Sequence, residues 1–167
     1  MSSAFRSLFE DLHMRHHTLV TQMCLGFMKG DRQLADDLSQ DVWINIWNGL
    51  EKFKGESSHK TWLYRITVNT CLQYIRKEKK NTRIDISDPD LKLTDDLTGT
   101  WDSDFSDLYH AIGHLGRIDR LIIMMVLDEL EYEEISKVVG ISAVNLRVKI
   151  HRIKERLKKI LTYEPGN

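Results

Sequence analysis

The chain has 167 residues, of which 41% are hydrophobic and 29% are charged, and its formal net charge is -1. Such a composition is typical of a globular protein with one ordinary domain or two small ones. No apolar run approaches the roughly 18 residues that a membrane-spanning helix needs, and no signal-peptide pattern is visible. We therefore expect a cytoplasmic protein without membrane insertion.

Charged residues are segregated along the chain rather than mixed. Residues 31–51 contain five acids and one base, residues 53–83 contain eight bases and two acids, and residues 84–107 contain eight Asp and one Lys. The last third of the chain turns basic again. Blocks of alternating sign indicate separate surfaces for separate partners, at least one of which is polyanionic.

Apolar residues recur with helical spacing along most of the chain, while strand-like alternation is scarce. The two prolines, Pro89 and Pro165, lie outside these periodic segments. The pattern predicts an all-α protein. The expected helices cover residues 4–28, 33–50, 58–80, 106–114, 117–129, 132–139 and 143–161.

Residues 84–104 lack this periodicity and contain Pro89, Gly99 and many Asp residues. Such a segment is expected to be an extended acidic linker rather than part of a packed core. It would divide the chain into two small helical domains, residues 1–83 and 105–167.

Cys24 and Cys71 lie inside apolar helical patterns, with no second cysteine or histidine at metal-binding spacing. We expect both to be buried, reduced thiols. The histidines His13, His16 and His17 would supply at most two ligands on one face of a helix, so no metal site is expected.

Sequence patterns of an enzyme are also missing. There is no nucleophile paired with a base, no glycine-rich phosphate loop and no zinc spacing. The acidic residues lie in the linker and on a solvent-facing helix, where they do not converge on a metal ion. We expect no catalytic residue, no cofactor and no small-molecule substrate.

The first basic block begins with a polar loop, residues 54–59, and continues as a helix that Ser57 or Ser58 is expected to cap. Unstacked bases can stack on aromatic and Arg side chains while amides bond to their edges, so one sector of this helix suits single-stranded or melting nucleic acid. The alternative is that Trp62 belongs to the core and the sector is an ordinary surface. The sector comprises Trp62, Arg65, Asn69, Gln73, Arg76 and Lys80.

Residues 132–161 have the pattern of a helix-turn-helix, in which the second helix enters a DNA major groove. Gly140 permits a sharp turn, Ile141 fills the corner, and Ser142 can cap the second helix. A plain helical hairpin with a solvated outer face is the alternative. The second helix carries seven Lys or Arg and one acid opposite an apolar stripe formed by Leu146, Ile150, Ile153, Leu157 and Ile160.

Together these regions resemble a bacterial sigma factor of the extracytoplasmic-function (group IV) class. Residues 35–47 (ADDLSQDVWINIW) resemble the helix with which that family binds core RNA polymerase, residues 53–80 its minus-10 segment, and residues 127–157 its minus-35 reader. The resemblance covers residues 5–161, with the elements in the family's order. It implies a transcription initiation factor that directs core polymerase to specific promoters and assists DNA melting.

The resemblance also implies roles for individual residues. Core polymerase, through its β′ clamp helices and with its β subunit as a further contact, is expected to meet Asp37, Gln40 and Asp41. Minus-10 promoter DNA is expected to meet Lys54, Ser57, Ser58, His59, Lys60, Trp62, Arg65, Asn69, Gln73 and Arg76. Minus-35 promoter DNA is expected to meet Ser142, Asn145, Arg147, Val148, Lys149, His151 and Arg152.

Some positions depart from the family's pattern. Gly116 stands where the family often has proline, His59 stands where an aromatic residue is frequent, and residues 144–147 (VNLR) replace the common Gly-Thr-Val-Lys. These differences leave the fold as expected and point to a different promoter.

An anti-sigma factor is a further partner by resemblance. The alternative function is a stand-alone helix-turn-helix regulator that binds a palindrome as a dimer, which leaves the sector from Trp62 to Lys80 without a role.

Overall fold

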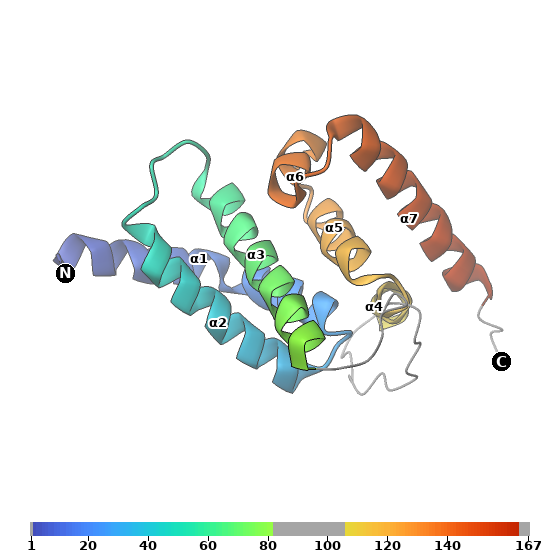
Figure 1. Cartoon of the computed structure of the whole chain (residues 1–167), viewed down its shortest axis with the longest axis horizontal. Helices are drawn as coiled ribbons and strands as arrows, with labels where there is room; N and C mark the ends of the chain where they lie inside the picture. Colours follow the sequence, from blue (N-terminus) through green and yellow to red (C-terminus); the bar gives the residue numbers. More distant parts are fainter. Residues whose placement is uncertain (1, 82–105, 164–167) are drawn as a thin grey trace.

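The computed structural model describes residues 2–81 and 106–163, and every regular element in these two ranges is a helix (Figure 1). The predicted all-α architecture is therefore confirmed, while the predicted acidic linker, residues 84–104, lies outside the described residues. The helices are α1 (Ser3–Phe27), α2 (Arg32–Leu50), α3 (His59–Asn81), α4 (Ser106–Gly113), α5 (Arg117–Leu127), α6 (Tyr132–Val139) and α7 (Ala143–Tyr163).

Each helix expected from the sequence is present, and its ends agree with the prediction to within two residues. The largest differences are at the C-terminal ends of α5 and α7. Helix α5 ends at Leu127 instead of residue 129, because Glu129 adopts a left-handed backbone conformation with φ of 61°. A left-handed residue cannot continue a right-handed helix. The apolar spacing of the sequence continues beyond Leu127, so the predicted end lies two residues too late.

Helices α1, α2 and α3 form the first helical domain around a shared apolar core. At the start of α2 the Asp31 carboxylate accepts a hydrogen bond from the backbone N–H of Leu34 at 3.1 Å. At the start of α3 the Ser58 hydroxyl accepts one from the N–H of Thr61 at 3.1 Å, so Ser58 is the predicted cap. The core residues include Val20, Met23, Val42, Ile46, Leu63 and Val68.

Helices α4 to α7 form the second helical domain, which contains the helix-turn-helix of α6 and α7. Gly140 has φ of 73°, a conformation that glycine adopts without strain. The Ser142 hydroxyl accepts a hydrogen bond from the backbone N–H of Asn145 at 3.3 Å, which confirms the predicted cap. The predicted apolar stripe of α7 is buried at Leu146, Ile150, Ile153 and Leu157 and half-buried at Ile160.

Cys24 of α1 and Cys71 of α3 are both free and buried, as expected. The structure adds that the two thiols meet in the core and share a hydrogen bond. This bond with Cys24, together with burial, raises the pKa of the Cys71 thiol well above its usual range. The distance between them in the sequence gave no sign of this pairing.

The two helical domains pack directly against each other, with α5 on α1 and α6 on α3 (Figure 1). Gly26 allows such close approach that an added Cβ would lie 2.8 Å from Cγ and Sδ of Met124. Buried Arg120 donates from Nε to the carbonyl oxygen of Phe27 at 3.1 Å, and its guanidinium lies 5.8 Å from the centre of the Phe27 ring. We call this arrangement the packed form.

None of the described helices is both long enough and apolar enough to cross a bilayer.

Substitution of Gly140 isolates the backbone requirement of the helix-turn-helix. No atom lies within 4 Å of a Cβ added there, so Gly140→Ala should lower the free energy of unfolding by about 1 kcal/mol through left-handed strain alone. The melting temperature in thermal unfolding should fall by about 2–4 °C. Gly140→Asn is the control, because Asn tolerates this conformation better. Equal losses for the two variants would contradict the explanation.

Candidate nucleic-acid interface

The face of α3 that points away from the core presents the polar end of the predicted nucleic-acid sector. Asn69, Gln73 and Arg76 are exposed, while Arg65 is half-buried. The Nε atom of Arg65 is buried and has no hydrogen-bond partner among the described residues. A buried donor without a partner is costly, and because this atom is enclosed it is not itself open to an approaching anion.

Trp62 is neither fully buried nor fully exposed, so neither sequence-based interpretation, core residue or part of the nucleic-acid sector, describes it completely. Its side chain is half-buried, its ring centre lies 5.2 Å from that of Phe53, and it packs beside Gly49 of α2. These contacts favour a packing role for most of the indole. The exposed amide and guanidinium part of the sector therefore begins at Asn69.

The loop before α3 places several polar predicted residues together. Lys54 is exposed, Ser57 is half-buried, and the Ser58 hydroxyl is engaged in capping α3. His59 packs on Phe53 with ring centres 4.8 Å apart. The loop can thus offer Lys54 to a ligand, while Ser57, whose hydroxyl donates to the carbonyl oxygen of Ser58 at 3.3 Å, shapes the loop together with Ser58 and His59.

A cationic field surrounds the start of α3. Burial, followed by the nearby positive charges of Lys60 and Arg15, lowers the pKa of His16 below its usual value. His16 therefore stays neutral at neutral pH. Its neighbours His13 and His17 stack at 5.9 Å, yet the described residues contain no group of three side chains that could hold a metal ion.

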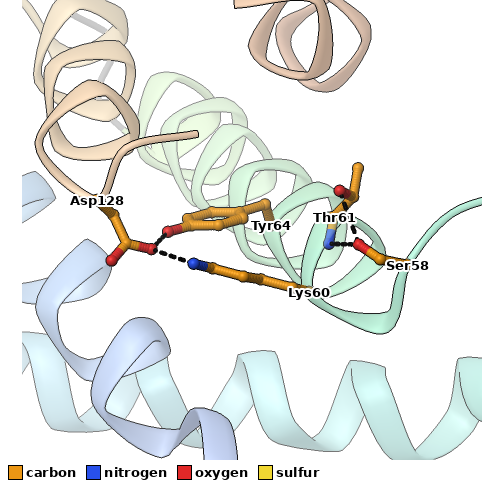
Figure 2. Close-up of polar contacts among 5 residues, drawn as sticks. All are labelled: Ser58, Lys60, Thr61, Tyr64 and Asp128. Carbon is orange, nitrogen blue, oxygen red and sulfur yellow. Dashed lines mark hydrogen bonds and ion pairs between the residues drawn. The ribbon is translucent and has the colours of Figure 1, made fainter. Parts of the chain in front are cut away.

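Lys60, also predicted to contact DNA, forms an ion pair with the second helical domain in the packed form. Its Nζ lies 3.3 Å from Oδ2 of Asp128, and the buried Tyr64 donates its hydroxyl to the same oxygen (Figure 2). Asp128 sits directly after α5. The Lys60 and Tyr64 side chains lie one turn apart on the side of α3 that faces away from Asn69, so this contact leaves the exposed sector uncovered.

A second ion pair joins the domains at the other end of α3. Arg117, at the start of α5, places Nη2 2.7 Å from Oε2 of Glu78. With the Asp128 contacts, it adds polar contacts to an interface whose buried part contains Met124 and the Arg120 hydrogen bond.

The exposed face of α7 presents most of the predicted minus-35 residues. Asn145, Arg147, Val148, His151 and Arg152 are exposed, and Arg147 lies 3.5 Å from Glu133 of α6. Two further predicted residues, Lys149 and Ser142, also have partners within the domain.

Lys149 forms an ion pair with Asp119 of α5 at 2.9 Å, and the Ser142 hydroxyl caps α7. These two contacts position the helix within its domain.

The third surface lies on α2, where Asp37, Gln40 and Asp41 are all exposed. Ile44, one turn further along the same face, has 57% of its surface exposed. An exposed apolar side chain beside two carboxylates is typical of a protein-binding surface. Ile44 is not among the polymerase-binding residues expected from the sequence, because helical spacing alone cannot tell the edge of a core from an exposed face.

Comparison with known proteins identifies the family. The models of sigma-70 region 2 and of sigma-70 region 4 match residues 12–81 and 105–157. Over 171 residues the chain is 30% identical to the RNA polymerase sigma factor YlaC of Bacillus subtilis, with 94% of each chain covered, and over 175 residues it is 25% identical to the ECF sigma factor SigW of the same organism. The chain belongs to the extracytoplasmic-function sigma factors.

As a sigma factor, the protein is a transcription initiation factor that directs RNA polymerase to promoters. The stand-alone regulator is not favoured by these matches.

Among solved structures, the sigma factor RpoE of Bartonella quintana, in complex with the anti-sigma factor NepR, has the same fold. Its TM-score is 0.71 at 19% identity, with 93% of this chain and 98% of that chain covered.

The structure of CnrH in complex with the cytosolic domain of CnrY also has the same fold. It matches with a TM-score of 0.68 at 20% identity, covering 95% of this chain and 90% of that chain.

Replacement of Asp128 tests the polar contact between the domains. Asp128→Asn removes the charge that Lys60 and Tyr64 share, which should weaken the packed form by about 1 kcal/mol after screening of the half-exposed ion pair. The population of molecules whose two domains are apart, which we call the separated form, should then increase about fivefold. The measurement is energy transfer between fluorophores attached to α2 and α7. Glu131→Gln removes an exposed charge nearby and is the control; equal changes in both variants would contradict the prediction.

Proposed function

We propose that this sigma factor uses three separate helices for its three macromolecular contacts. The exposed face of α2 binds core polymerase, the exposed sector of α3 binds minus-10 DNA, and the exposed face of α7 reads the minus-35 element. The observation that carries the proposal is the separation of charge in space: the acids of α2 and the bases of α3 and α7 lie on different exposed helix faces. The proposed domain limits are residues 1–83 and 105–167, joined by residues 84–104.

The proposed polymerase surface consists of Asp37, Gln40, Asp41 and Ile44. The first three offer acceptors to a basic partner, and Ile44 offers apolar area at the centre of the contact. The β′ clamp helices are the proposed partner, with the β subunit as a further contact.

DNA binding by both domains requires the packed form to open. As their names state, the minus-10 and minus-35 elements lie about 25 base pairs apart, which is roughly 85 Å at about 3.4 Å per pair. In the packed form α6 lies against α3, so the helix-turn-helix is next to the minus-10 helix. We infer that polymerase binds the separated form. Because the domain interface keeps most free chains in the packed form, it lowers the apparent affinity of the free chain for polymerase.

An anti-sigma protein is a proposed partner, because the similar sigma factor RpoE is in complex with the anti-sigma factor NepR, and CnrH is in complex with the cytosolic domain of another protein, CnrY. A partner that binds the packed form would stabilise it by mass action and so keep the sigma factor from polymerase. The protein is proposed to act in the cytoplasm and to carry out no reaction of its own.

The function is tested by run-off transcription with core polymerase and genomic DNA fragments. Addition of the purified chain should produce discrete transcripts that core polymerase alone does not make. The free chain should bind the same promoters weakly, because its two domains are packed together. Absence of new transcripts would contradict the function, and tight binding of a palindrome by the free chain would favour a regulator.

Charge reversal tests the proposed surface on α2. Asp37→Lys together with Asp41→Lys should lower the affinity for core polymerase at least tenfold, because two acceptors become repulsive charges. Pull-down with core polymerase measures the affinity, and circular dichroism checks the helix content. Glu155→Lys is the control, since Glu155 is an exposed acid that lies on α7 and not on α2. Equal affinity of the double variant and the control would remove α2 from the interface.

Arginine substitutions separate base reading from phosphate binding on α7. Replacement of Arg147 or Arg152 by Ala should reduce discrimination between matched and mutated minus-35 elements by about 1–3 kcal/mol if each contacts a base through two hydrogen bonds. Competition binding with the polymerase complex measures the difference. An equal loss of affinity for all sequences would assign both residues to phosphates.

A further inference from the structure

Two valines interrupt the polar exposed face of α7. Val144 has 74% of its surface exposed and Val148 has 47% exposed. They lie four residues apart and therefore one above the other on the helix. Around them the face is made of groups that bond or carry charge, namely Asn145, Arg147, His151 and Arg152.

Neither helix stability nor core packing accounts for these valines. The apolar stripe of α7 is already supplied by Leu146, Ile150 and Ile153, which lie on the opposite side and are buried. A β-branched residue is also a poorer helix former than the Lys, Arg or Glu residues common on solvated helix faces. Exposed apolar groups on a face otherwise suited to DNA indicate an apolar contact with that DNA.

The DNA major groove offers one apolar group on its base edges, the C5-methyl of thymine. Residues at the N-terminal end of the second helix in a helix-turn-helix are those that reach base edges, and Val144 and Val148 lie in its first two turns. We propose that Val144 and Val148 each contact a thymine methyl in the minus-35 element. This proposal rests on the proposed function of α7.

The spacing of the valines limits where these thymines lie. Four residues of an α-helix rise about 6 Å, which corresponds to about two base-pair steps. The two methyl groups should therefore come from base pairs that are one or two steps apart, on either strand. The neighbouring Arg147, His151 and Arg152 supply the polar contacts on both sides of the valines.

Deoxyuridine provides the test, because it pairs like thymidine but lacks the methyl group. The complex of core polymerase and this sigma factor is assembled on a promoter found by run-off transcription, and each thymine of the minus-35 element is replaced singly. Affinity should fall about fourfold at two positions, the effect of one buried methyl group, and remain unchanged elsewhere. Val144→Ala and Val148→Ala should each abolish the effect at one of these positions.

A control variant separates the valine contacts from a general effect of apolar truncation. Met14 on α1 is also 74% exposed, so Met14→Ala removes a comparable exposed side chain far from α7 in the sequence. It should keep the deoxyuridine effect at both positions. Both Val→Ala variants should fold, since alanine is the better helix former.

The outcomes distinguish this proposal from the proposed function. Promoter-specific binding that is insensitive to every deoxyuridine would overturn the valine contacts alone. An unchanged deoxyuridine effect in both Val→Ala variants would assign the methyl groups to other residues and also overturn them. Failure to direct transcription from any promoter would sink the proposed function and, with it, this inference.

Discussion

The contact of Asp128 with Lys60 and Tyr64 holds the turn after α5 against the first turns of α3. The contact uses the side of α3 that continues from the core, while Asn69 and Gln73 remain exposed on the other side. Packing of the two domains therefore leaves the proposed DNA-binding faces of α3 and α7 exposed, but it fixes the distance between them. The domain interface therefore sets a spacing between these two faces, whereas promoter DNA sets the spacing between the minus-10 and minus-35 elements.

The charge blocks of the sequence become neighbouring surfaces within one bundle. Helices α2 and α3 pack side by side, and Asn45 of α2 donates a hydrogen bond to the Thr70 hydroxyl of α3 at 3.0 Å. The acidic face of α2 and the basic face of α3 are thus fixed relative to each other by the core. With core polymerase on α2 and promoter DNA on α3, as proposed, this rigid connection would fix the position of the DNA relative to the polymerase.

Local features were predictable from the sequence because their signals are local. Helical periodicity gave the seven helices, Ser58 and Ser142 gave two caps, and Gly140 gave the left-handed turn. The end of α5 was missed because the left-handed conformation of Glu129 has no signature in the residue type.

Contacts between distant parts of the chain could not be predicted in this way. Nothing in the spacing indicates that Lys60 meets Asp128, that Lys149 meets Asp119, or that a thiol of α1 meets one of α3. Lys60, Lys149 and Ser142 were assigned to DNA by charge or by resemblance, and the structure gives each of them a partner within the protein. Their roles in binding DNA remain predictions.

The paired thiols in the core have a practical consequence for chemical labelling. Reactive cysteines are accessible thiolates, whereas Cys24 and Cys71 are fully enclosed, and Cys71 is held in its protonated form. Maleimide and iodoacetamide should therefore modify a cysteine introduced on the surface while sparing both natural ones in the folded protein. Probes can be attached to either domain without first removing two side chains that fill the centre of the first bundle.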